Sequence, residues 1–153
     1  MVERRSSKDS KKGDLTETEI LVRMVEGELD GPFQPENGED FELKNQLHAI
    51  ERLGEIGGEN ELKYLQKLNH YEHDSKFTGV IEGDPYSSTR SFYTHTYLYP
   101  NAKGSLGRAL ELSYDDRDYD YYEETPDVDL SNRHPQKIIH YAMETIRERL
   151  KEG

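Results

Sequence analysis

Apolar residues recur at the spacing of an amphipathic helix in several parts of the chain, which predicts a helical framework. The first helix is expected over about 17–29, where Thr16 and Glu19 have the spacing of an N-terminal capping box. The clearest helix follows Asp40, a plausible N-cap, because its apolar positions cover about half of the helix surface. A last helix is expected over about 135–151, and the proline at its start suits the first turn.

The second and third helices are expected to be neighbours in space. Gly57 should end the second helix in the left-handed conformation, and Asn60 should cap a third helix over about 61–72. Because the connection is short, the two helices are expected to pack as an antiparallel pair. Leu47 and Ile50 lie on the apolar face of the second helix and should both be fully buried.

The segment from about 73 to 133 has a different character, since turn-forming residues replace the helical periodicity. Residues 77–81 and 90–99 are expected to be strands, joined as a hairpin through residues 82–89. A short helix is expected over about 105–112, and an acidic run rich in tyrosine follows it. The sequence therefore predicts a β-hairpin and an acidic loop inserted into a helical protein.

The second predicted strand alternates between two kinds of side chain, so its two faces should differ. One face carries aromatic rings, which offer a large contact area with little loss of rotamer entropy. Its members are Tyr93, His95, Tyr97 and Tyr99. These rings either contact a partner or cover the helices with their polar tips in water, and the sequence leaves both interpretations open.

The composition favours one modest core and an acidic surface. The chain has 153 residues, of which 32% are hydrophobic and 34% are charged, and its formal net charge is −12. We expect residues 1–14 to be a disordered basic tail and residues 15–153 to form a single helical domain that contains the insert. The expected fold class is mainly α, with an α+β character that comes from the inserted hairpin.

Charge and cysteine content argue against several classes of function. The chain has no cysteine, which excludes disulfides, thiolate zinc sites and cysteine nucleophiles. The acidic balance disfavours a nucleic-acid partner, because phosphate contacts need clustered lysine and arginine. The N-terminus has no apolar signal segment and no stretch approaches the length of a membrane span, so we expect a cytoplasmic protein without a membrane partner.

Residues 43–68 resemble one unit of the HEAT-repeat family. The stretch from Leu47 to Gly57 is similar to the first helix of such a unit, with its small residue, its Leu-Gly pair and its terminal glycine. Residues 134–150 are similar to the first helix of a following unit, which proline commonly opens. The resemblance implies antiparallel helices and protein binding on a concave helical face, with no catalytic residues shared across the family. The long insert is a departure from the family pattern.

The predicted function is noncatalytic binding of another protein that has a basic surface. The insert combines aromatic anchors, which supply affinity, with concentrated negative charge, which supplies steering and partner choice. The acidic candidates for this contact are Asp115, Asp116, Asp118, Asp120, Glu123 and Glu124. One alternative is an inhibitor whose acidic surface mimics nucleic acid, and another is that the acidic run is only a solvated loop.

Metal binding or catalysis is a further alternative. His70 and His73 lie three residues apart near the expected end of the third helix, where they either share a metal with a carboxylate or complement the helix dipole. The alternating aspartates after residue 115 have the start of a calcium loop but lack its glycine. No catalytic motif stands in the sequence, so we expect no enzyme activity, no cofactor and no metal.

Overall fold

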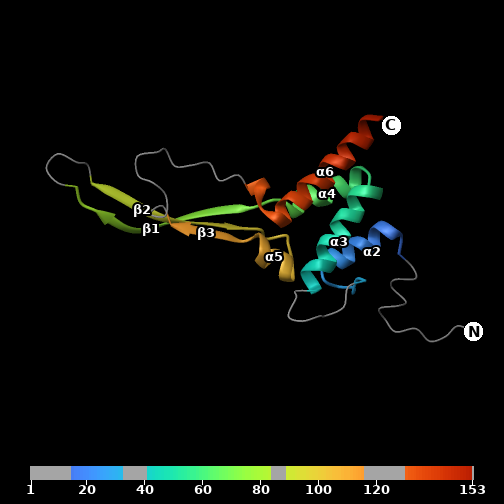
Figure 1. The fold of residues 1–153 in the computed structure, drawn as a ribbon, viewed down its shortest axis with the longest axis horizontal. Helices are drawn as coiled ribbons and strands as arrows, with labels where there is room; N and C mark the ends of the chain where they lie inside the picture. Colours follow the sequence, from blue (N-terminus) through green and yellow to red (C-terminus); the bar gives the residue numbers. More distant parts are fainter. Residues whose placement is uncertain (1–14, 33–40, 84–88, 116–129, 153) are drawn as a thin grey trace, which may run out of the picture.

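The computed structural model describes residues 15–32, 41–83, 89–115 and 130–152. In these ranges the architecture mixes α and β, with a helical body and a sheet that extends away from it (Figure 1). The helices are α2 (Glu17–Val25), α3 (Phe41–Ile56), α4 (Glu59–Leu68), α5 (Gly104–Leu110) and α6 (His134–Glu152), with a 3-10 turn η2 (Leu130–Asn132) before α6. The strands are β1 (Glu72–Ile81), β2 (Arg90–Leu98) and β3 (Leu112–Asp115). Among the described segments, no helix has both the length and the apolar character that a membrane crossing requires.

Helix α2 begins with the predicted capping box. The Thr16 hydroxyl accepts from the backbone N–H of Glu19 at 3.2 Å, and the Glu19 carboxylate accepts from the backbone N–H of Thr16. The helix ends at Val25, earlier than expected, and Gly27 then adopts a left-handed backbone with φ of 78°. Leu29 follows the shortened helix and is still buried in the core.

Helix α3 is the centre of the body, and its apolar face is buried as predicted. Leu47 is 7% exposed and Ile50 is fully buried. The helix packs mainly against α2 and α6 and also contacts α5. The predicted antiparallel pairing of α3 with α4 is wrong, because α4 packs on α6 and shares few contacts with α3. This packing gives no support to a HEAT-type helical pair at this position.

The connection between α3 and α4 explains this difference. Gly57 does not take the left-handed conformation that the sequence suggested, and its N–H donates to the carbonyl of Leu53 at 2.7 Å. Gly58 is extended and is the N-cap of α4, in place of the predicted Asn60. Glu61 completes this cap by accepting from the N–H of Gly58 at 2.8 Å. The new helix therefore starts in a new direction and does not fold back along α3.

Helices α3 and α6 approach each other closely at a single small residue. A Cβ atom added to Gly54 would lie 2.8 Å from Cα and 2.9 Å from Cβ of Ala142. Two turns further along α6, the Arg149 guanidinium donates to the carbonyls of Gly54 and Gly57. Arg149 thus satisfies carbonyls at the C-terminus of α3 and complements its negative end.

A buried glutamine of α3 joins the end of α2 to the start of α5. The Gln46 amide donates to the carbonyls of Val25 at 2.9 Å and Lys103 at 2.8 Å, and its oxygen accepts from the N–H of Leu106 at 2.9 Å. One turn earlier, the Glu42 carboxylate accepts from the N–H of Ser105 at 2.7 Å. Side chains of α3 therefore cap the N-terminus of α5, and they fix where the chain returns from the sheet to the body.

The three strands form an antiparallel sheet in the order β1-β2-β3. The hairpin was predicted, but β1 begins at Glu72 rather than residue 77, because α4 ends at Leu68 and frees the preceding residues for pairing. The register shifts between Phe77 and Gly79, which marks a bulge in β1. Strand β3 was not predicted, since its polar sequence gives little signal, and it forms because β2 offers a free edge.

Candidate functional site

The two faces of the sheet carry different side chains, because neighbouring residues of a strand point to opposite sides. The register places His73 opposite Tyr97, Ser75 opposite His95 and Phe77 opposite Tyr93. We define the aromatic face by the residues that this alternation and the ring contacts place on one side, namely Tyr71, His73, Ser75, Phe77, Tyr93, His95, Tyr97 and Tyr114. The other side, the threonine face, carries Thr78, Thr94, Thr96, Ser113 and Asp115.

The rings of the aromatic face touch one another across all three strands. The Tyr97 ring lies 5.4 Å from Tyr71 and 4.5 Å from His73, and it is parallel to the imidazole within 5°. The His73 and His95 ring centroids are 5.1 Å apart, and His95 lies 5.1 Å from Tyr114 on β3. The result is a continuous row of π-systems from the base of the sheet to its middle, held in place by strand register.

Much of this face is open to solvent. Phe77 is 59% exposed, Tyr71 is 44% exposed and Tyr93 is 38% exposed. Within the described ranges, the strands contact one another extensively and no strand packs along a helix, and Figure 1 shows the sheet reaching away from the body. Exposed aromatic rings that are clustered, rather than scattered singly, are typical of an interaction surface.

His73 and His95 form a hydrogen-bonded pair at the centre of this face. The His73 Nε2 and His95 Nδ1 atoms are 2.9 Å apart, and the Ser75 hydroxyl lies 2.9 Å from the same His95 nitrogen. The distance between the two ring centroids exceeds the distance between the two nitrogens by 2.2 Å (5.1 minus 2.9). A difference this large arises only when both nitrogens lie nearly on the line that joins the two centroids. The rings therefore meet edge to edge, with one nitrogen donating its proton to the other.

Tyr99 is not part of the exposed surface, and the prediction that it is an exposed anchor is wrong. It follows the end of β2, is 4% exposed and belongs to the core of the body. Burial raises the pKa of its phenol, an effect that nearby Arg133 partly opposes. The alternation that placed Tyr99 beside Tyr97 is correct along the strand, but at this residue the chain enters the helical body.

The acidic candidates do not join the aromatic face in the part of the chain that the structure describes. Asp115 lies on the threonine face, where its Oδ2 accepts from the hydroxyls of Thr78 at 3.3 Å and Thr94 at 3.4 Å. It therefore links the three strands from the side opposite the rings. The remaining candidates lie outside the described residues, namely Asp116, Asp118, Asp120, Glu123 and Glu124.

Sequence reasoning missed half of the face. Tyr71, His73 and Phe77 lie at alternate positions before and along β1, and that alternation was a usable signal. The expected helix to residue 72 and the expected strand start at residue 77 hide this alternation, because they split it between different elements. Tyr114 was assigned to a loop, and only its pairing with His95 places it here.

The metal alternative based on a shared helix face is wrong. Helix α4 ends at Leu68, so His70 follows the helix and His73 lies in β1. In the part of the chain with described placement, no group of three or more His, Asp or Glu side chains is arranged to hold a metal ion. The edge-to-edge geometry of His73 and His95 also differs from that of two metal ligands, whose lone pairs converge on a third point. The aspartates of the calcium-loop pattern lie outside the described residues.

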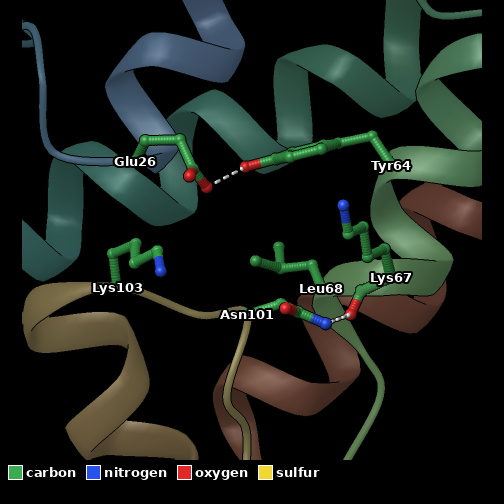
Figure 2. Close-up of a pocket in the computed structure, with 6 residues that line it drawn as sticks. All are labelled: Glu26, Tyr64, Lys67, Leu68, Asn101 and Lys103. Atoms are coloured by element: carbon green, nitrogen blue, oxygen red, sulfur yellow. Dashed lines mark hydrogen bonds between the residues drawn. The ribbon is translucent and has the colours of Figure 1, made fainter.

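A second candidate is a small pocket of about 170 Å³ between α2, α4 and the connection that leads into α5 (Figure 2). Tyr64 donates to the Glu26 carboxylate at 2.6 Å, and burial together with this carboxylate raises the pKa of the phenol. Lys67 and Lys103 also line the pocket, and Asn101 donates to the carbonyl of Lys67 at 3.0 Å. Both lysines are exposed and the Glu26–Tyr64 bond is already satisfied, so we interpret this region as a junction between elements.

The Tyr64 bond gives a prediction with a defined sign. The unfolded chain loses the phenol proton above about pH 10, whereas the folded protein keeps it to higher pH, so stability falls as the pH rises through that range. Tyr64→Phe should lower the free energy of unfolding by about 1 kcal/mol at neutral pH. We expect the gap between wild type and variant to narrow above about pH 10 in urea titrations. Tyr141 is 74% exposed, so Tyr141→Phe should change neither the free energy of unfolding at neutral pH nor its dependence on pH. If the difference in stability between wild type and Tyr64→Phe stayed constant above about pH 10, the raised pKa of the Tyr64 phenol would be contradicted.

Comparisons with known proteins give no independent assignment of the site. A scan against models of protein families and searches of curated proteins and of solved structures found no match to this chain. In the described residues, the aromatic face offers stacking and hydrogen bonding on an open surface. Such contacts can bind a ligand, and the open face has room for an extended one.

Proposed function

We propose that this protein is a noncatalytic binding protein that captures an arginine-rich segment of a partner protein on the aromatic face of its sheet. The observation that carries the proposal is the continuous row of partly exposed rings, which no helix covers in the described ranges. A folded protein gains nothing by leaving such rings in water. Tyrosine is among the residues that most often dominate binding energy in interfaces.

The charge of the chain favours a cationic partner. The net charge is −12, and β1 also carries Glu72 and Asp74, which its alternation places on the threonine face, opposite the row of rings. The acidic run that contains Asp116 to Glu124 follows β3 directly in the sequence. A positively charged partner is steered toward such a surface, and a negatively charged one is repelled.

Arginine suits both the row of aromatic rings and the acidic charge of the chain better than lysine does. Its planar guanidinium stacks on aromatic rings and pairs with carboxylates, whereas the lysine ammonium is a strongly hydrated point charge. An extended segment of the partner can lay successive arginines along the row of rings. The HEAT resemblance also implies protein binding, but on the helices rather than on the sheet.

Two alternative functions, a nucleic-acid mimic and an enzyme, have weaker support. A nucleic-acid mimic would rely on the acidic run, and those residues lie outside the described ranges. An enzyme would require catalytic groups assembled in a cleft, and the described pockets bring no such group together. Nucleic acid itself remains an unsuitable partner for these rings, because phosphates would meet a strongly acidic chain.

The test is binding of a fluorescently labelled peptide in which arginine and serine alternate. The variant with Tyr93→Ala and Tyr97→Ala should bind this peptide at least about tenfold more weakly than wild type in anisotropy titrations, because two stacking anchors are lost. Its far-ultraviolet circular dichroism should keep the helical signal, since neither ring belongs to the core of the body.

Two controls make the result specific. Tyr141→Ala removes a tyrosine that is 74% exposed on α6 and should leave the peptide affinity unchanged. A peptide with lysine in place of arginine should bind more weakly than the arginine peptide. Equal affinity of wild type and the double variant would contradict the proposal, and unfolding of the double variant would show that these rings stabilise the protein.

A further inference from the structure

Strand β1 lies at one edge of the sheet, and within the described ranges it pairs with β2 alone. Apart from Gly79, every residue of this strand is exposed, and Phe77 is 59% exposed. The outer edge of such a strand presents a row of N–H and C=O groups, which is a template for pairing with another strand. We propose that β1 pairs antiparallel with β1 of a second copy of this chain, so that the two sheets form one continuous sheet.

The symmetry of such a dimer restricts its register. Two identical antiparallel edges are related by a two-fold axis perpendicular to the sheet, so each side chain lies opposite a residue from its own face. One residue of β1 must therefore lie at the axis, opposite its own copy. The bulge between Phe77 and Gly79 limits regular pairing to the part of the strand before it. The centres that leave residues for pairing on both sides are His73, Asp74, Ser75 and Lys76.

The charges of β1 select the register that is centred on Ser75. In this register Asp74 lies opposite Lys76 of the second copy, and the symmetry forms this pair twice. Opposite charges stabilise a cross-strand pair, whereas like charges directly opposite destabilise it. A centre at Asp74 would pair Glu72 with Lys76 but would place two carboxylates at the axis, and a centre at Lys76 would place two ammonium groups there. A centre at His73 would place Glu72 opposite Asp74, and both are acidic.

Within one copy, the neighbours of these two charges across the strand are uncharged. Asp74 lies opposite Thr96 of β2, and Lys76 lies opposite Thr94. A lysine on an edge strand often prevents unwanted pairing, because an approaching strand must accommodate its charge. When that strand is a second copy in this register, its aspartate supplies the complementary charge. The edge therefore discriminates against other strands and accepts its own copy.

The same register joins the aromatic faces of the two copies. Phe77 lies opposite His73 of the second copy, so this exposed ring gains an aromatic neighbour across the new strand pair. Because the two-fold axis is perpendicular to the sheet, both aromatic faces lie on the same side of it. The inference does not depend on the proposed function, but the dimer would present two rows of rings to a binding partner.

The first test is analytical ultracentrifugation of the whole chain at about 0.15 M salt, which screens the net charge of two acidic chains beyond about 8 Å. Wild type should be in reversible equilibrium between monomer and dimer. We expect a dissociation constant on the order of tens of micromolar, because one pair of strand edges buries little surface.

Charge variants test the pairing. Lys76→Glu and Asp74→Lys each place like charges opposite each other and should weaken the dimer at least about tenfold. An equimolar mixture of these two variants should dimerise again, since one chain then supplies only acidic and the other only basic side chains at these positions. This recovery also shows that both variants are folded. Lys63→Glu, on the exposed side of α4, makes the same change in net charge and should leave self-association unchanged.

Cross-linking tests the register, because the chain has no cysteine of its own. Directly opposite residues of antiparallel strands have Cα atoms about 4.5–5.5 Å apart, which is within the range of a disulfide. Ser75→Cys should therefore form an intermolecular disulfide at least about tenfold faster than Phe77→Cys under the same oxidant. In the proposed register the two copies of residue 77 are offset by four residues, or about 13 Å along the strands.

The outcomes are decided without a peptide, so they leave the test of the proposed function separate. A wild-type chain that stays monomeric up to about 500 µM overturns the proposal. A dimer that persists unchanged in both Lys76→Glu and Asp74→Lys also overturns it, because the copies then meet elsewhere. Cross-linking of Phe77→Cys as fast as Ser75→Cys contradicts the register centred on Ser75.

Discussion

Replacing Gln46 with leucine should lower the free energy of unfolding by on the order of 3–6 kcal/mol, a large part of the stability of a small domain. The leucine is close in size to glutamine, so the loss comes from hydrogen bonding rather than from a cavity. The carbonyl of Val25 and the N–H of Leu106 would lose their glutamine partner in a buried place, and the carbonyl of Lys103 would keep only its bond from the N–H of Gly107 at 3.3 Å. Each unsatisfied buried group costs about 1–3 kcal/mol.

The same substitution at an exposed residue is the matched control. Gln66 lies on the exposed side of α4, and Gln66→Leu should change stability by no more than about 0.5 kcal/mol. Urea unfolding followed by circular dichroism measures both variants. If Gln46→Leu is as stable as wild type, then the glutamine does not hold the ends of α2 and α5 together.

Substituting Gly54 with alanine should also destabilise the protein, although alanine is the better helix former. Helix propensity alone favours alanine by about 1 kcal/mol at an interior position. The new methyl group would lie within 3 Å of the backbone and Cβ of Ala142, and α3 and α6 would have to move apart. Overpacking of this kind costs about 1–3 kcal/mol, and separating the helices would also strain the Arg149 contacts with α3.

Two further variants identify the clash as the cause. Adding Ala142→Gly to Gly54→Ala removes the contact with the Ala142 Cβ atom. The double variant should therefore be more stable than the sum of the two single changes in free energy of unfolding predicts. Gly58→Ala introduces a methyl group that meets only the end of the Glu61 side chain at 3.9 Å, so it should cost no more than the roughly 1 kcal/mol that alanine loses at an N-cap, and Ala142→Gly should not reduce that cost. A gain in stability for Gly54→Ala would show that propensity outweighs packing here.

For the site, the sequence by itself determined that one strand carries a row of rings. Tyr93, His95 and Tyr97 share a face because strand periodicity is a local property of the backbone. Strand pairing decided the rest, since register brings His73 and Tyr114 from distant parts of the chain against His95. No local pattern states which residue lies opposite another, so the histidine pair could not be predicted.

For the fold, the sequence determined the helices, the hairpin and the burial of Leu47 and Ile50, because amphipathic spacing and caps act within a few residues. Only the tertiary structure decided which helix each apolar face meets. It directed α4 onto α6 rather than α3, and it buried Tyr99 at the point where β2 enters the body. The physical reason is that the hydrophobic effect is not directional. An apolar pattern therefore shows that a face must be buried, but it does not specify which distant segment covers that face.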